Sequence, residues 1–395
     1  MQRLKIGVWI EENYIPTAGG GFGYYSELIG CISKTKFSNA DICFLGERSS
    51  NPINIGYYKY FSVKWRQQKK RVCPLLIKLI GTKLFHINTI TNYYQNLDKK
   101  QNESLYSELH NICDIIYYPI PMCKYENFPF IYTLWDLGHL NTYAFPEVSN
   151  NGVFEERKKH YDKIPFKALM ILCESEAGKN DAIYYLRLNK ERLRVLPLFP
   201  SGVISENVVP CKPHIINSDS IFIHYPAQYW AHKNHYNLIC AFRLIANKYP
   251  YLKLILTGSD QGNKTYVRKT IKEYNLEDCV IDLGFVPLEE LKWLYTHSKG
   301  LIMPTLLGPT NMPPLEALTL GCPVAVSDIP GHREQLGDNA IYFNPLDIEE
   351  IKNAIVNLIS NNVKQTVSNF PTIQTNMDLL DKYFAELKTI RHTWA

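Results

Sequence analysis

Between two short apolar runs the chain reads Gly308-Pro309-Thr310-Asn311-Met312-Pro313-Pro314-Leu315-Glu316-Ala317-Leu318. The flanking runs, residues 300–304 and 321–327, each have the length and composition of a buried strand. The segment between them predicts one short helix, because Asn311 is a favourable N-cap residue and the first turn of a helix tolerates proline. A helix between two buried strands is typical of a parallel α/β sheet.

The start of this predicted helix is a candidate site for a phosphate or diphosphate. Its free N–H groups and the positive end of the helix dipole favour an anion there. Glu316 lies about one turn further along, where its carboxylate can accept hydrogen bonds from a pair of sugar hydroxyls. From the local pattern alone, a surface helix with a solvated Glu316 is an equally good interpretation.

A longer segment, residues 304–345, resembles the donor-binding region of retaining glycosyltransferases of family 4, which have the GT-B fold. The resemblance is carried by Pro304-Thr305, Gly308 to Ala317, Gly321-Cys322-Pro323-Val324, Ser327-Asp328, Gly331, Glu334 and Asp338-Asn339-Ala340. Where that family usually has a Glu-x7-Glu pair, this chain has Gly308 and Glu316, so it is most similar to a subgroup with a GPTN-type sequence. The resemblance implies two Rossmann-like, doubly wound parallel-sheet domains that face each other across a cleft.

The rest of the chain alternates predicted strands with predicted helices, which also indicates the α/β class. We expect a first domain at residues 1–200, with a basic insertion at 58–100, and a second domain at 214–375. Prolines at 197, 200, 210 and 213 mark the linker between them. Residues 377–390 carry apolar side chains on one helical face, and the resemblance implies that a final helix, within 376–395, crosses back onto the first domain.

A glycine-rich loop of the first domain is a candidate for contact with the donor. It follows the first predicted strand, Leu4–Ile10, and precedes a helix predicted from Tyr24. Glycines at such a turn let backbone N–H groups approach an anion closely, although a flexible turn is the commoner reason for them. The loop resembles the first glycine loop of the family, which implies that Gly20, Gly21 and Phe22 face the donor phosphates across the cleft.

A second candidate loop follows the strand predicted at 129–134. The carboxyl ends of parallel strands are where α/β folds place ligands, so Asp136 and His139 are candidates for gripping a hydroxyl of the acceptor or the donor sugar. The segment resembles the His-Asp-Leu strand end of the family, with Trp135 where the histidine usually stands. For His139, a plain surface position is the alternative interpretation.

The second domain carries the most informative cation, Lys233, at a predicted strand-to-helix junction. The family usually has an Arg and a Lys five residues apart here, both directed at the donor diphosphate. This chain keeps the lysine and has Gln228 in place of the arginine. One ammonium with helix N–H groups can still offset the charge of a leaving diphosphate. Further on, Gly284-Phe285-Val286 resembles the loop where the backbone of the family contacts the base.

The distribution of charge along the chain points to a candidate interaction surface in the first domain. Residues 58–100 contain ten Lys or Arg and a single acid, Asp98, whereas the whole chain has a net charge of only +5. Basic residues beside an apolar patch suit an anionic membrane surface, and an insertion packed on its own domain fits equally well.

The ten cysteines are scattered singly, which indicates reduced thiols in the cytoplasm. No apolar run approaches a membrane span, and Glu11-Glu12 interrupts the first strand, unlike a signal peptide.

We therefore expect a retaining, metal-independent, mannosyltransferase-like hexosyltransferase, cytoplasmic or peripheral on the inner face of the plasma membrane. It would move a hexose-type sugar from a UDP- or GDP-linked donor to a glycan or lipid-linked acceptor, without a cofactor or nucleic acid. The predicted catalytic residues are Asp136, His139, Lys233 and Glu316. The predicted donor-binding residues are Gly20, Gly21, Phe22, Gln228, Lys233, Phe285, Val286, Thr310, Asn311, Met312, Pro313 and Glu316. A sugar-nucleotide epimerase of similar fold and a non-catalytic nucleotide-sugar-binding subunit are the alternatives.

Overall fold

The computed structural model describes residues 3–11, 20–47, 58–63, 105–142, 144–200, 202–217, 219–360 and 370–391. The predicted membrane-facing stretch falls mainly on residues 64–100 and therefore lies outside the described residues. Among the helices that are described, none is long and apolar enough to cross a membrane. The nine described cysteines are all unpaired.

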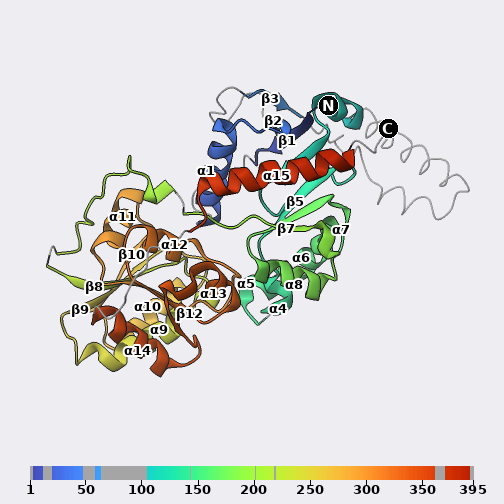
Figure 1. The fold of residues 1–395 in the computed structure, drawn as a ribbon. Helices are drawn as coiled ribbons and strands as arrows, with labels where there is room; N and C mark the ends of the chain where they lie inside the picture. The colour runs from blue at the N-terminus through green and yellow to red at the C-terminus, as the bar shows by residue number, and fades with distance from the viewer. Residues whose placement is uncertain are drawn as a thin grey trace, which may run out of the picture.

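Two parallel sheets form the centres of two domains (Figure 1). The first sheet has the strand order β3-β2-β1-β4-β5-β6-β7. Its strands are β1 (Leu4–Trp9), β2 (Ala40–Gly46), β3 (Tyr60–Ser62), β4 (Ile115–Tyr118), β5 (Phe130–Leu134), β6 (Met170–Cys173) and β7 (Leu193–Val195). The central strands β4, β5 and β6 are buried along their whole length, as expected when helices cover both faces of a parallel sheet.

The second sheet has the strand order β10-β9-β8-β11-β12-β13, again with every pair parallel. Its strands are β8 (Ile221–Pro226), β9 (Leu252–Thr257), β10 (Val280–Gly284), β11 (Leu301–Met303), β12 (Val324–Ser327) and β13 (Ile341–Phe343). The strands predicted on either side of the 308–318 segment are β11 and β12. Together the two sheets confirm the predicted α/β class with two doubly wound domains.

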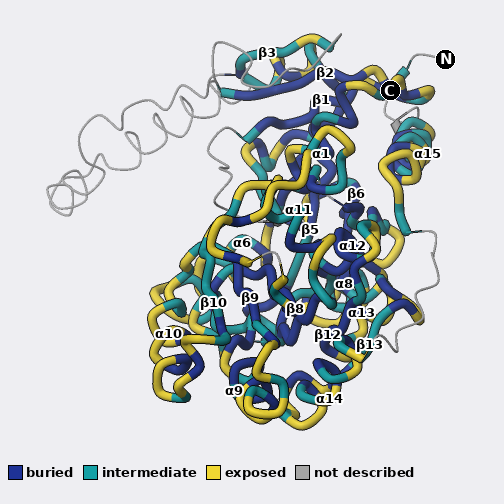
Figure 2. The backbone as a smooth tube through the Cα atoms, turned by 90° about the vertical axis from the view of Figure 1, so that its left-hand side faces the viewer, coloured by how far each residue is buried: buried dark blue, intermediate teal, exposed yellow. Residues whose placement is uncertain are grey.

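Helices cover both sheets (Figure 2). Those of the first domain are α1 (Gly20–Lys34), α4 (Gly138–Asn141), α5 (Pro146–Ser149), α6 (Val153–Tyr161), α7 (Ile164–Lys167) and α8 (Glu176–Leu186). Those of the second are α9 (His235–Ala246), α10 (Lys264–Glu273), α11 (Leu288–His297), α12 (Met312–Thr319), α13 (Pro330–Leu336) and α14 (Ile348–Ile359). Short 3-10 turns are η2 (Lys190–Arg192), η3 (Gly202–Ile204), η4 (Ala231–Lys233) and η5 (Gly337–Asn339).

The last helix, α15 (Ile373–Arg391), lies across the first domain in Figure 1. Its buried face adds Met377, Leu380 and Phe384 to the apolar core of that domain. Tyr383 Oη also donates a hydrogen bond to the carbonyl of Val195 at 2.6 Å. The chain therefore passes between its domains twice, once after β7 and once before α15.

Proline lies at two element boundaries of the first domain. Helix α6 ends at Tyr161, and α7 begins separately at Ile164 with Pro165, which has no N–H, in its first turn. Strand β7 ends at Val195, two residues before Pro197. Tyr60–Ser62, expected within the basic insertion, instead forms the edge strand β3 beside β2.

Candidate functional site

The helix predicted after Asn311 is α12, and a lysine contacts its first turn. Asn311 occupies the N-cap position in an extended conformation, and Pro313 and Pro314 fall in the first turn, as predicted. The Asn311 side chain makes no capping bond to its own helix. Its Oδ1 instead accepts a hydrogen bond from Lys233 Nζ at 2.9 Å. The fold thus brings together the helix start and the cation that the sequence singled out separately.

His332 fixes the orientation of the Asn311 amide. The Nδ1–H of His332 donates to the carbonyl of Ser327 at 2.8 Å, and Nε2 accepts from Asn311 Nδ2 at 2.9 Å. Burial lowers the pKa of His332 to about 4, so the ring is neutral near pH 7 and can accept through one nitrogen. The amide nitrogen of Asn311 therefore faces His332, and its oxygen faces Lys233.

Few backbone donors remain at the start of α12. The N–H of Asn311 donates to Gln335 Oε1 at 3.3 Å, and Pro313 and Pro314 have no N–H. Of the first three helical residues, only Met312 carries a backbone donor. An anion bound here would therefore depend more on the ammonium of Lys233, and less on backbone N–H groups, than the sequence suggested.

The loop that carries Lys233 is held by hydrogen bonds to three other segments. Tyr225 Oη donates to the Lys233 carbonyl at 2.6 Å. The next residue, Asn234, has a left-handed backbone (φ 57°). Its side-chain nitrogen donates to the carbonyls of Pro304 and Pro345 at 3.0 and 2.8 Å. These contacts fix the turn between β8 and α9 and thereby the direction in which the lysine extends.

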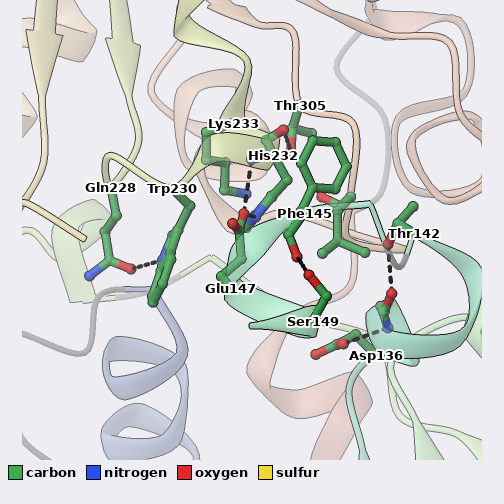
Figure 3. Close-up of polar contacts among 12 residues, drawn as sticks. Asp136, Thr142, Phe145, Glu147, Ser149, Gln228, Trp230, His232, Lys233 and Thr305 are labelled. Carbon is green, nitrogen blue, oxygen red and sulfur yellow. Dashed lines mark hydrogen bonds and ion pairs between the residues drawn. The ribbon is translucent and has the colours of Figure 1, made fainter. Parts of the chain in front are cut away.

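An acid from the first domain reaches this loop (Figure 3). Glu147, on α5, accepts a hydrogen bond from the backbone N–H of His232 at 2.9 Å and also contacts His232 Nδ1. Burial lowers the pKa of Lys233 to about 8, while the negative charges of Glu147 and Asp136 counteract part of that shift. One domain therefore helps to set the charge of a cation that belongs to the other.

Glu316 lies inside α12 and is only 5% exposed, so the surface-helix interpretation is wrong. Its Oε2 accepts a hydrogen bond from Tyr295 Oη, on α11, at 2.8 Å. Burial and the Glu316 charge raise the pKa of Tyr295 well above its ordinary value, which keeps the phenol protonated as a donor. The carboxylate is thus oriented by a tyrosine on a neighbouring helix, a contact that the sequence did not reveal.

Gln228 and the 284–286 loop follow the carboxyl ends of β8 and β10. They therefore lie at the same edge of the second sheet as Lys233. The amide of Gln228 accepts from Trp230 Nε1 at 3.1 Å (Figure 3). It also donates to Ser259 Oγ at 3.0 Å. Phe285 is 62% exposed, so its ring is available for stacking. Val286 packs instead against a small apolar cluster that includes Phe222.

The first-domain residues predicted to face the donor are at the start of α1. Gly20, Gly21 and Phe22 are already helical, so the helix begins four residues before the predicted Tyr24. Met312, from the second domain, also packs on the first domain, because its side chain belongs to the apolar core cluster of the first domain, with Phe199. The beginning of α12 is therefore packed against both domains.

Asp136 and His139 are not equally placed to grip a hydroxyl. His139 is 1% exposed, and its Nδ1 accepts a hydrogen bond from Arg157 Nε at 3.2 Å. Burial lowers its pKa to about 4, and its ring stacks on Tyr161. The surface interpretation of His139 is therefore wrong, whereas its role in gripping a hydroxyl stays a prediction. The Asp136 side chain is 32% exposed and pairs with Arg157, so it remains accessible.

Two glycines shape the loop before α12. Gly308 has φ +107°, a conformation that side chains other than glycine rarely adopt. A Cβ on Gly331, in the first turn of α13, would lie 1.2 Å from the carbonyl oxygen of Pro309. Helix α13 therefore packs directly against this loop, and only glycine permits it.

Glu334, also on α13, joins the two domains. Its carboxylate accepts hydrogen bonds from the N–H groups of Glu176 and Ala177 at 2.7 and 2.9 Å. Those N–H groups belong to the first turn of α8, where they have no partner within the helix. The N-cap of α8 is Ser175. Figure 1 shows α5, α8 and α13 together at the junction of the domains. Within the described ranges, no cluster of three or more His, Cys, Asp or Glu side chains is arranged to hold a metal ion.

Comparison with known proteins identifies the second domain. Residues 212–370 match the family described as Glycosyl transferases group 1. The O-antigen chain mannosyltransferase RfbU of Salmonella typhimurium is 32% identical over 129 residues, 33% of this chain and 36% of that protein. The O-antigen chain mannosyltransferase B of Escherichia coli is 28% identical over 123 residues, 30% of this chain and 32% of that protein. The chain thus spans about a third of the length of these curated relatives.

Solved structures extend the likeness to the whole chain at the level of fold. Sucrose-phosphate synthase from Thermosynechococcus elongatus superimposes with a TM-score of 0.62 at 14% identity, covering 99% of this chain and 98% of that one. Anabaena Alr3699/HepE in complex with UDP-glucose gives 0.57 at 16% identity, with both chains covered completely. Residues 212–370 therefore belong to the glycosyl transferases group 1 family, within a chain that has the GT-B fold.

Proposed function

We propose that this protein is a retaining, metal-independent glycosyltransferase. It transfers a hexose-type sugar, with mannose as the first candidate, from a UDP- or GDP-linked donor to an acceptor hydroxyl. The acceptor is a glycan or lipid-linked saccharide of a surface polysaccharide. The named O-antigen mannosyltransferases support this choice of sugar and acceptor, and the UDP-glucose complex of a fold neighbour supports a nucleotide-sugar donor.

The observation that carries the proposal is the contact between Lys233 Nζ and Asn311 at the start of α12. An ammonium at the positive end of a helix dipole favours a diphosphate. Burial makes that ammonium costly without a compensating anion, and the lowered pKa of Lys233 reflects this. Glu316 follows one turn later in the same helix and is proposed to bind ribose or sugar hydroxyls.

In the proposed reaction the bond between the anomeric carbon and the diphosphate breaks while the acceptor oxygen attacks from the same face. The leaving phosphate accepts the proton of the acceptor hydroxyl, so no enzyme nucleophile is required. Lys233 and the Met312 N–H stabilise the negative charge that develops on the diphosphate. Asp136, on the acceptor side, orients a hydroxyl, and closure of the domains excludes water that would hydrolyse the donor.

We also propose that residues 58–100 bind an anionic membrane surface, where a lipid-linked acceptor would lie. The observation behind it is the charge of +9 carried by residues 58–100, since basic segments are attracted to anionic lipids. The test is sedimentation with anionic liposomes. Replacing Lys69, Lys70 and Arg71 with glutamine should release the protein, and unchanged sedimentation would remove this part of the proposal.

The central test measures donor recognition first and transfer second. Thermal stabilisation by UDP, GDP, TDP and ADP identifies the nucleotide, because a bound ligand stabilises the folded state. Lys233→Met should abolish that stabilisation, whereas Lys269→Met, on the exposed face of α10, should leave it unchanged. Glu316→Ala should weaken binding of the nucleotide sugar in calorimetry. If neither Lys233→Met nor Glu316→Ala reduces affinity, the assignment of the site is wrong.

Transfer of label then separates the proposal from its alternatives. A glycosyltransferase releases free nucleoside diphosphate and moves labelled sugar to a glycan or lipid acceptor. An epimerase of similar fold would change the donor sugar without needing an acceptor. A non-catalytic binding subunit would bind the nucleotide sugar with no transfer to acceptor or water.

A further inference from the structure

A cavity of about 450 Å³ lies between the domains, beside the two segments that connect them. Pro197 and Leu198, just after β7, line one side, and Phe370 and Pro371, just before α15, line another. Its volume falls within the range of small-molecule binding sites. Neither Lys233 nor Glu316 is among the described residues that line it, but Thr310, one of the predicted donor-binding residues, does line it. The cavity therefore adjoins the proposed diphosphate site without including its cation.

Three buried polar atoms belong to residues that line this cavity and have no hydrogen-bond partner in the described part of the chain. They are Glu174 Oε2, Thr310 Oγ1 and Gln335 Nε2. Buried polar groups are nearly always paired, so unpaired ones in the wall of one cavity require an explanation. A ligand that supplies hydroxyl groups would provide the missing partners.

The orientation of two of these groups is fixed by contacts outside the cavity. Gln335 Oε1 accepts from the Asn311 N–H at 3.3 Å, which leaves the amide nitrogen as the unpaired end. Glu174 Oε1 accepts from Ser175 Oγ at 2.9 Å. The Glu174 carboxyl also lies so close to Gly178 that a Cβ there would approach Oε1 to 2.5 Å. The Glu174 side chain is 6% exposed. It is therefore held in place by Ser175 and Gly178 at the start of α8.

The chemistry of the walls favours a neutral ligand. Among the described lining residues there is no lysine or arginine, and there are two carboxyl groups, those of Glu174 and Glu334. Burial raises the pKa of Glu174 well above its ordinary value, which favours the protonated carboxyl, a group that can both donate and accept. The Glu334 carboxylate is already paired with α8. A phosphate would therefore find no counter-charge here.

Apolar side chains complete the cavity. Leu198, Leu336 and Phe370 lie among the polar residues of its wall. A pyranose ring has hydroxyl edges that form hydrogen bonds and a C–H face that packs on apolar or aromatic side chains. We propose that this cavity is a binding site for a neutral sugar residue, next to the diphosphate site but not part of it, with Glu174, Thr310 and Gln335 binding its hydroxyls and Phe370 its C–H face. This inference concerns binding and does not depend on the proposed transferase reaction.

The test uses methyl glucoside, methyl galactoside and methyl mannoside as probes with the full-length protein. Saturation-transfer NMR and calorimetry are performed with UDP or GDP present at saturation, so that the diphosphate site is occupied. At least one glycoside should bind in a one-to-one complex. Glu174→Leu should weaken it about three- to tenfold, as expected for one lost neutral hydrogen bond, whereas Glu174→Gln, which keeps a donor and an acceptor, should retain the affinity.

A second variant keeps the test decisive if Glu174→Leu fails to fold. Leu198→Trp places a larger apolar side chain in the cavity and should strongly weaken glycoside binding while nucleoside diphosphate still stabilises the protein. The proposal is overturned if none of the three glycosides binds, or if Leu198→Trp leaves their affinity unchanged. It is also overturned if inorganic phosphate competes for the cavity, or if a crystal structure with glycoside shows only ordered water beside the three atoms.

Discussion

The charge state of Lys233 gives the sharpest test of the proposed diphosphate site. Burial lowers its pKa to about 8, so the ammonium is lost at a lower pH than for an ordinary lysine, whose pKa is about 10.4. A diphosphate binds the protonated form and not the neutral amine. Affinity for the nucleoside diphosphate should therefore be constant below about pH 7.5 and fall as the pH rises through 8.

The size of the effect follows from the pKa of the free protein. With a pKa of about 8, roughly nine in ten molecules carry the ammonium at about pH 7 and roughly one in ten at about pH 9. The dissociation constant should thus rise about eightfold to tenfold between those two values, equivalent to roughly 1.2–1.4 kcal/mol. Above the pKa of the complex, which the bound diphosphate raises, the curve should level off.

Calorimetry across this pH range, with the nucleotide that stabilises the protein best, measures the profile directly. Lys233→Arg keeps its charge throughout, so it serves as the control for ionisation of the ligand itself and should give a flat profile. Glu147→Gln removes a negative charge that raises the pKa of Lys233, so its affinity should begin to fall at a lower pH. Superimposable profiles for the wild type and Lys233→Arg would refute the reasoning.

Three substitutions and one control test the backbone and the crossing helix. Gly331→Ala is measured by thermal stabilisation, and the others are measured by urea denaturation. Gly308→Ala should destabilise the protein by about 1–2 kcal/mol because φ is +107° there. The control Gly30→Ala, inside α1 with open space around it, should be neutral or stabilising by about 0.5–1 kcal/mol. Equal changes in stability for the two variants would contradict this prediction. Gly331→Ala should displace Pro309 and thereby reduce nucleotide-induced thermal stabilisation. Unchanged stabilisation would show that α13 can move to accommodate the added methyl group without disturbing the site. Phe384→Ala should cost about 3–5 kcal/mol, since this α15 side chain is buried in the first domain; a loss below 1 kcal/mol would show that α15 is not part of that core.

The elements that the sequence predicted well are those with strong local signals. The start of α12 follows from Asn311 and two prolines within four residues, and the strands around it follow from short apolar runs. Lys233 was identifiable because it stands at a strand-to-helix junction. These signals are contained in a few neighbouring residues, so no knowledge of tertiary contacts is needed to find them.

The parts that the sequence did not reveal depend on contacts between distant segments. Glu147 lies 85 positions from its partner His232, and Tyr295 lies 21 positions from Glu316 on another helix. His139 was assigned to the cleft because it follows a strand end, but packing on Tyr161 and Arg157 buries it. The choice between a buried and an accessible side chain is made by helix α6, whose place against the loop no local pattern encodes.

The site is therefore a property of the junction and of neither domain alone. The cation comes from the second domain, but Glu147 of the first moderates its charge. Met312 begins the helix that faces the cation, yet its side chain is packed in the core of the first domain. Glu334 completes the start of α8 from across the junction. Separating the domains would remove Glu147 from the neighbourhood of Lys233 and leave the α8 donors unpaired, so the balance of charges around the cation depends on contact between the domains.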